Sequence, residues 1–330
     1  MATYKGIQGF SIQNLSADPP DGNEGQVWYN STSNVWKVTD ATTAGAWATG
    51  GDLNTARRGL QSSGAGTQTA GLVAGGYSTA IIGATEEYNG ATWTTSPGSL
   101  NTARIKGSVA GTQTAAIYAT GTGAPGTLTE TESYDGTSWT VVPATVNTKR
   151  EAAGTAGIQT AAIIAGGGSP GDATPIMANS ESYNGTSWTN TPSLNTSRVD
   201  LIGFGTNIAA TVAGGNTGSF TGATEEYNGA TWTSVNSMNT ARSQLGGAGT
   251  TQTAGLAFAG RIPSVTAATE EYDGTSWTST SNMATAREQL AGAGTNTAAL
   301  AAGGYTTANT AATEEWTGPG ALVTKTITVS

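Results

Sequence analysis

The sequence contains no cysteine and no histidine among its 330 residues. Their absence excludes Ser-His and Cys-His nucleophile pairs, thiolate chemistry, haem and iron–sulfur ligation, and the usual zinc and copper sites. Carboxylate, lysine, tyrosine and hydroxyl chemistry remain. We therefore expect no metal site and no cofactor.

Charged residues and long apolar runs are also scarce. Only 11% of the residues are charged, and 13 Lys and Arg against 22 Asp and Glu give a formal net charge of −9. Binding to a phosphate backbone needs clustered Lys and Arg, so we expect no nucleic-acid partner. No run of about 18 apolar residues occurs, and the first residues lack the apolar core of a signal peptide. These features predict a soluble protein made in the cytoplasm, without membrane insertion.

The abundant residues are small, and they recur in a repeat. Glycine occurs 48 times, and Ala, Thr, Ser and Asn are frequent, which favours an all-β chain. One phrase, TEEYNGATW at residues 85–93, returns in varied form until its sixth copy contains Glu314, Glu315 and Trp316. Two other phrases, similar to LNTAR and GTQTAGLVAGG, also occur six times. The copies are about 46 residues apart, a spacing typical of propeller blades.

Each repeat unit predicts four short strands. Its apolar residues form runs bounded by Gly, Asn and Thr, without helical periodicity. In the first unit we expect strands at residues 59–63, 70–74, 85–88 and 92–95. Asn89-Gly90, between the last two, is a pair favoured in two-residue hairpin turns.

A double Gly, a Tyr-(Asn/Asp)-Gly turn, a Trp about five residues later and an Arg that opens the next unit together resemble the kelch repeat of β-propellers. The resemblance covers residues 46–330 and implies a six-bladed kelch-like β-propeller. The Thr-, Gly- and Asn-rich composition of the repeats is also similar to that of kelch-like virion and tail-fibre proteins of tailed bacteriophages. A fold of this kind does not fix a function.

The two chain ends suggest how such a ring closes. Residues 46–49 align with a fourth strand that has no preceding strands of its own, whereas the sixth unit lacks a fourth strand. We expect residues 46–49 to complete it, so that residues 46–330 form one domain. The competing interpretation assigns that place to residues 322–329, which alternate like a strand.

Residues 1–45 lie outside the repeat. Residues 25–38 predict a hairpin with Trp28, Tyr29 and Trp36 on its two strands, similar to hairpins near the start of phage tail proteins. One interpretation is an attachment or oligomerisation segment that binds other virion proteins. The other is a decoration packed on the side of the propeller.

Two charged positions recur in all six units, and we interpret both as structural. A residue present in every blade serves the blade, whereas an active site in a propeller is assembled once. The economical hypothesis pairs each arginine with a glutamate, within a unit or between units. The arginines are Arg57, Arg104, Arg150, Arg198, Arg242 and Arg287, and the glutamates are Glu86, Glu132, Glu181, Glu225, Glu270 and Glu314.

The connections between the second and third strands differ most among units. Between the second Gly of the double-Gly position and the first Glu they contain 9, 10, 13, 9, 9 and 9 residues. Loops on a rigid scaffold are the usual place for recognition, and aromatic with polar side chains suit sugars. The alternative is that these loops are tolerated insertions without a ligand. The candidate ligand-binding residues are Tyr77, Asp172, Phe220, Arg261 and Tyr305.

These observations predict a non-enzymatic phage virion surface protein. It would be a tail fibre or head appendage that displays a loop face for host-surface recognition, with a host glycan as a candidate partner, or for capsid decoration. The alternative is a cellular glycan- or protein-binding kelch propeller, and a carboxylate-based glycan lyase or hydrolase ranks third. A fibre would often be a homotrimer, whereas a decoration protein could be monomeric.

Overall fold

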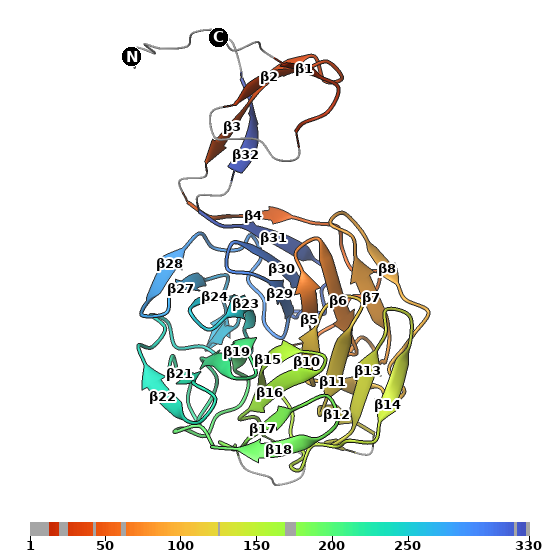
Figure 1. The fold of residues 1–330 in the computed structure, drawn as a ribbon, viewed down its shortest axis with the longest axis vertical. Helices are drawn as coiled ribbons and strands as arrows, with labels where there is room; N and C mark the ends of the chain where they lie inside the picture. Colours follow the sequence, from red (N-terminus) through yellow and green to blue (C-terminus); the bar gives the residue numbers. More distant parts are fainter. Residues whose placement is uncertain are drawn as a thin grey trace. The chain divides into compact units, whose positions relative to one another are not determined.

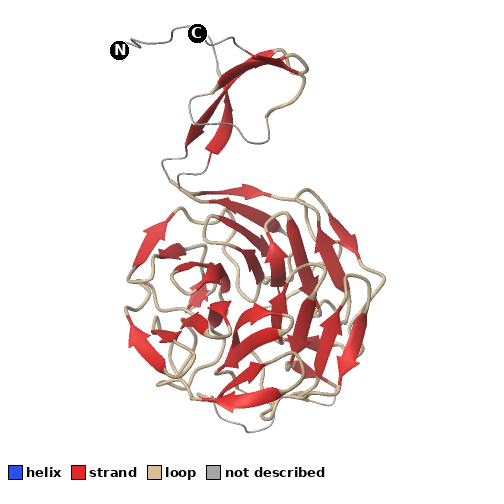
Figure 2. Cartoon of the chain, in the orientation of Figure 1, coloured by secondary structure: helices blue, strands red, loops and turns tan. Residues whose placement is uncertain are grey.

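The computed structural model describes residues 13–19, 26–41, 44–60, 64–124, 126–168, 176–319 and 322–327. The chain forms two compact units, residues 46–317 and residues 1–45 with 318–330. The described elements are strands joined by loops and turns (Figure 2). Among the described residues, no helix is long and apolar enough to cross a membrane.

The described part of the larger unit contains six four-stranded antiparallel sheets, which we number in chain order. Sheet 1 consists of β5 (Gly64–Thr67), β6 (Ala70–Ala74), β7 (Thr85–Tyr88) and β8 (Trp93–Thr95). Sheet 2 consists of β10 (Ser108–Gly111), β11 (Ala116–Ala119), β13 (Thr131–Tyr134) and β14 (Trp139–Val142). Sheet 3 consists of β15 (Gly154–Ile158), β16 (Ala161–Ala165), β17 (Ser180–Tyr183) and β18 (Trp188–Thr191).

The remaining three sheets repeat this order. Sheet 4 consists of β19 (Ile202–Thr206), β20 (Ala209–Ala213), β21 (Thr224–Tyr227) and β22 (Trp232–Val235). Sheet 5 consists of β23 (Gly246–Thr251), β24 (Ala254–Phe258), β27 (Thr269–Tyr272) and β28 (Trp277–Thr280). Sheet 6 consists of β29 (Ala291–Gly294), β30 (Ala298–Ala302), β31 (Thr313–Thr317) and β4 (Ala46–Thr49). Two short pairs, β9 (Arg104–Ile105) with β12 (Thr122–Gly123) and β25 (Arg261–Ile262) with β26 (Ser264–Val265), lie in the connections.

In sheet 1 the last three strands lie within one residue of the predicted positions, but the first does not. The sequence predicts it at residues 59–63, whereas β5 occupies Gly64–Thr67. The first strand therefore leads directly into the tight turn before β6. Gly66 has φ +93°, and a Cβ there would lie 2.1 Å from the carbonyl oxygen of Ala70. Glycine is needed at this position because the backbone of the partner strand lies so close.

The six sheets are arranged around a common centre (Figure 1). The first strand of each sheet contacts the first strands of both neighbours, and β29 of sheet 6 contacts β5 of sheet 1. Close approach requires small residues, since a Cβ on Gly64 would lie 2.5 Å from the carbonyl oxygen of Gly292. The all-β, propeller-like architecture expected from the sequence is present.

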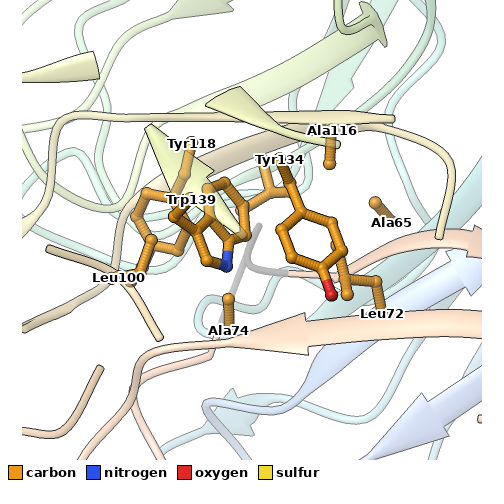
Figure 3. Packing of buried hydrophobic residues seen from close by; sticks show 9 residues of the cluster. Ala65, Leu72, Ala74, Leu100, Ala116, Tyr118, Tyr134 and Trp139 are labelled. Atoms are coloured by element: carbon orange, nitrogen blue, oxygen red, sulfur yellow. The ribbon is translucent and has the colours of Figure 1, made fainter. Parts of the chain in front are cut away.

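The hydrophobic core lies between neighbouring sheets. In Figure 3, Tyr134 and Trp139 of sheet 2 lie close to Leu72 and Ala74 of sheet 1. The ring centroids of Tyr134 and Trp139 are 4.9 Å apart. Similar buried clusters join each following pair of sheets, and one of them joins sheet 6 to sheet 1. Small residues near the centre and aromatic residues farther out fill the widening space between sheets.

The strand at residues 46–49 pairs with β31, as the sequence analysis expected. Trp47 lies opposite Trp316 in the register, with ring centroids 5.4 Å apart. The competing C-terminal strand, β32 (Leu322–Thr326), pairs instead with β3 of the smaller unit. The assignment of the C-terminal residues to the repeat domain therefore needs correction. Alternation in the sequence shows that residues 322–326 form a strand, but it does not show which edge they join.

The smaller unit contains one sheet in the order β1 (Gln13–Leu15), β2 (Val27–Asn30), β3 (Val35–Ala41) and β32. Strands β2 and β3 form the expected hairpin. Trp28 is fully buried, and its indole N–H donates a hydrogen bond to Asp18 at 3.3 Å. Tyr29 contacts Trp36, which remains 38% exposed. Trp28 is thus a core residue of the smaller unit, whereas Trp36 is partly open to solvent.

Candidate functional site

The six repeated arginines and glutamates form ion pairs within their own units. Arg57 Nη2 lies 2.9 Å from Glu86 Oε1, and the Arg150–Glu181 distance is 2.6 Å. The other pairs are Arg104–Glu132, Arg198–Glu225, Arg242–Glu270 and Arg287–Glu314. All six arginines are fully buried.

Each pair also holds backbone groups that would otherwise lack partners. Arg57 donates hydrogen bonds to the carbonyl oxygens of Gly75 and Ala84, and Glu86 accepts hydrogen bonds from the backbone N–H groups of Asn54 and Thr55. Burial lowers the pKa of the Arg242 guanidinium to about 10, although Glu270 opposes the shift. A buried charge bonded to a carboxylate and to backbone carbonyl oxygens fixes the entry to each sheet, and its burial keeps the guanidinium away from a ligand in solvent.

The second glutamate of each Glu-Glu pair faces the next sheet, because neighbouring strand residues point to opposite faces. Glu87 of sheet 1 accepts a hydrogen bond from Tyr134 of sheet 2 at 2.6 Å. Glu315 of sheet 6 accepts one from Tyr88 of sheet 1 at 2.5 Å. Burial and this hydrogen bond raise the pKa of Tyr88 to about 12. The two carboxylates of a pair therefore point to opposite faces of the strand, and in sheets 1 and 6 they bind different partners.

Two further contacts repeat between sheets. Trp139 of sheet 2 donates its indole N–H to Thr85 of sheet 1, and Trp93 of sheet 1 donates to Thr313 of sheet 6. Gln68 donates to the carbonyl oxygens of Ala299 and Trp316 in sheet 6. Sheet 1 is thus joined to sheet 6 by the same contacts that join sheet 2 to sheet 1.

The residues around the centre of the larger unit differ between its two ends. At the end formed by the turns between first and second strands, a cavity of ≈ 370 Å³ is lined by the first strands of all six sheets. Its wall consists mainly of Gly, Ala and Thr, and no charged side chain lines it. This cavity offers backbone groups and hydroxyls but no general acid or base.

The opposite end, which we call the loop face, is formed by the connections between second and third strands and by the segments after each repeated arginine. Backbone bridges join the two sets, for example Arg58 with Tyr77 and Glu288 with Tyr305. The residue two positions after each arginine has positive φ, and these residues form a ring of backbone hydrogen bonds. The ring contains Gly59, Lys106, Ala152, Asp200, Gln244 and Gln289, and Leu60 N–H closes it on the carbonyl oxygen of Gln289.

Polar side chains fill the middle of this ring. Lys106 Nζ lies 3.5 Å from Glu151 Oε1 and 4.0 Å from Asp200 Oδ1. Gln244 donates to Asp200 at 3.3 Å, and Gln289 donates to Gln244 at 3.4 Å. Burial tends to lower the pKa of Lys106, but the attraction of Asp200 and Glu151 outweighs it and raises the pKa. These groups bond to one another, and we call this cluster the polar plug.

The candidate ligand-binding residues are only partly brought together. Tyr77 and Tyr305, from sheets 1 and 6, both lie against the guanidinium of Arg58. Arg261 is 48% exposed by side chain and pairs with Glu288 at 3.4 Å. Phe220 belongs to the loop of sheet 4, across the ring from sheet 1, and bridges to Asn216. Asp172 lies outside the described residues.

Sequence reasoning missed Arg58 itself. It follows the repeated Arg57, and the residues at the same position in the other units are Ile105, Glu151, Val199, Ser243 and Glu288. The sequence signal that could have identified Arg58 is that it is the one basic residue at this repeat position. The acidic and polar members of the plug were missed because only the fold brings them to one axis.

Within the described ranges, no group of three or more acidic side chains is arranged to hold a metal ion. Comparison of the sequence with models of known protein families gives no match, and comparison with curated proteins gives none either. The loop face and the resemblance of the repeats are therefore the two features from which a function can be inferred.

Proposed function

We propose that the larger unit is a six-bladed, kelch-like β-propeller closed by β4. The proposal is supported by six sheets in a circle, the contact of β29 with β5, and the repeated Trp–Thr, Tyr–Glu and Gln–backbone contacts that also join sheet 6 to sheet 1. A closed ring leaves no exposed sheet edge at the seam.

The protein serves as a non-enzymatic virion surface protein of a tailed phage, either a tail fibre or a head appendage. The observation that carries this proposal is that the repeated residues and the singular residues lie in different places. The repeated charged groups are buried in ion pairs such as Arg57–Glu86, whereas the singular residues Tyr77, Arg261 and Tyr305 lie on the loop face. This is the design of a rigid scaffold that displays one recognition surface. The virion assignment follows from the resemblance of the repeats to phage proteins.

The smaller unit is the attachment segment in this proposal. It has its own buried residue, Trp28, and it presents Val27, Trp36 and Ile327 at 38–39% exposure. Exposed apolar residues on a small sheet favour contact with another protein. The partners would be other virion proteins, with the loop face left free for the host surface or for decoration.

Immunogold electron microscopy of intact phage particles from the source culture tests the proposal. Antibodies raised against the whole protein should label either the tail tip or the head, and the two positions separate host recognition from decoration. Antibodies pre-absorbed with the purified protein provide the control and should give no label. Particles that carry no label, with the protein found free or on cells, would overturn the virion assignment and favour a cellular binding propeller.

A further inference from the structure

The loop face has one position that combines a cation with aromatic rings. The residues immediately after the double-Gly position are Tyr77, Thr122, Gly168, Asn216, Arg261 and Tyr305. At this position tyrosine therefore occurs only in the units of sheets 1 and 6, the two sheets that meet where the ring closes. Arg58, the lone basic residue at its own repeat position, lies at the same seam.

The three side chains are in contact. The guanidinium carbon of Arg58 lies 5.0 Å from the ring centroid of Tyr77 and 4.7 Å from that of Tyr305. All three side chains are partly exposed. Contact with a ring face orients a guanidinium and restricts its rotamers, but it does not use up the N–H groups. Arg58 is thus held in place by Tyr77 and Tyr305.

The site also has unused hydrogen-bonding capacity. Within the described part of the chain, the Arg58 side chain has neither a hydrogen bond nor an ion pair. Asn309, from the same loop as Tyr305, donates its amide to the carbonyl oxygens of Tyr77 and Ser78. Its Oδ1 atom is buried and lacks a partner among the described residues. A donor fork therefore lies against two tyrosine rings, whereas the nearby Glu288 is already paired with Arg261.

We propose that this seam site binds the carboxylate of an acidic sugar. The planar Arg58 fork matches a carboxylate, and the tyrosines offer rings and hydroxyls to a sugar. A single carboxylate also suits a site with one free cation in a protein of net charge −9 better than a multiply charged phosphate. The inference rests on the proposed function, because it names the class of host glycan that the loop face would recognise.

Titration calorimetry with the full-length protein tests the site. The probes are sodium D-glucuronate and sodium N-acetylneuraminate, and D-glucose is the matched neutral sugar because it differs from glucuronate only at C6. We expect at least one acidic sugar to bind and D-glucose to bind at least about tenfold more weakly. Absence of binding by both acidic sugars would overturn the proposal, as would equal binding of D-glucose.

Two matched variants locate the binding. Arg58→Gln removes the cation of the site, and Lys149→Gln removes one positive charge from an exposed side chain elsewhere. We expect Arg58→Gln to weaken binding of the acidic sugar about tenfold or more, with no change for Lys149→Gln. Thermal unfolding of both variants checks that each is folded. Should Arg58→Gln prove unstable, Tyr305→Ala provides the second test and should weaken binding as well.

Two other probes separate the sugar from other carboxylates. Sodium acetate should bind much more weakly than the acidic sugar, because it has no ring or hydroxyls to contact the tyrosines. A short peptide of Asp and Glu that binds through Arg58, while both sugars fail, would replace the sugar assignment with an acidic peptide. Immunogold labelling of particles is independent of these titrations, so the virion assignment can stand when the sugar site fails.

Discussion

Trp47 donates its indole N–H to Thr269 at 3.0 Å, although 222 residues separate them in the sequence. The contact joins β4, near the start of the chain, to sheet 5, and it repeats the Trp–Thr contact found between other neighbouring sheets. A segment before the first complete sheet therefore acts as the last strand of the final one. This pairing links the two ends of the larger unit and covers the edge of β31.

The buried ion pairs predict a large difference between two arginine substitutions. Arg242→Lys keeps the charge but loses the fork that reaches Glu270 and the carbonyl oxygens of Ala257 and Ala268. We expect it to lower the free energy of unfolding by about 2–4 kcal/mol. Arg261→Lys, at an exposed pair, should change it by less than about 0.5 kcal/mol. Urea denaturation of both variants measures the difference, and equal stabilities would contradict the structural role of the repeated pair.

One sheet interface lacks a contact that the others have. Trp232 Nε1 and Ser180 Oγ are both buried without a partner in the described residues, at the position where a threonine accepts the tryptophan N–H in other sheets. Ser180→Thr should restore this hydrogen bond, because the extra methyl restricts the hydroxyl rotamer. We expect a gain of about 1 kcal/mol.

The matched control for Ser180→Thr is Thr131→Val, which removes the acceptor of the Trp188 indole N–H. It should lower stability by about 1–3 kcal/mol, because it leaves that N–H buried and unpaired. Thermal unfolding of both variants gives the comparison. A Ser180→Thr protein that is less stable than the wild type would show that the two unpaired groups at this interface are not a defect.

Glu226 and Glu271 hold the same repeat position in the neighbouring sheets 4 and 5. We expect substitution by glutamine to lower the stability of the protein at Glu226 and to raise it at Glu271. Glu226 accepts a hydrogen bond from Tyr272 of the next sheet, so Glu226→Gln should cost about 1 kcal/mol. The residue that would serve Glu271 in the same way is Trp316, which has no hydroxyl, and Glu271 Oε1 is buried without a partner in the described chain. Glu271→Gln should therefore raise the melting temperature at pH 7.

The effect of Glu271→Gln should also depend on pH. Burial raises the pKa of Glu271 in the folded protein. A group of this kind favours the fold below its unfolded pKa, and that contribution is lost as the pH rises through the folded pKa. The gain from glutamine should therefore be present at pH 7 and shrink as the pH falls toward 4. Melting temperatures across this range measure it, and a gain that grows in acid would contradict the assignment.

The sequence predicts the repeat far better than it predicts the site. Spacing and hairpin turns define the strands at residues 70–74 and 85–88, because each needs only local signals. The partners of Arg57 and Glu87 are harder to predict. The partner of Arg57 lies within the same unit, whereas the partner of Glu87 lies in the next sheet. The contact of Arg58 with Tyr305 depends on closure over nearly the whole repeat domain, and no local pattern predicts it. The edge chosen by β32 likewise depends on the fold, because an alternating strand fits either candidate edge.

Closure of the ring by β4 is the claim on which both the scaffold and the seam site depend. The chain has no cysteine, so an introduced pair can report on one contact at a time. Ala46 and Thr317 are register partners, and the Ala46→Cys/Thr317→Cys protein should form an intramolecular disulfide that speeds migration on a non-reducing gel. The competing pair Glu315→Cys/Thr324→Cys should stay reduced under the same mild oxidation. A disulfide in the second protein but not in the first would contradict closure by β4.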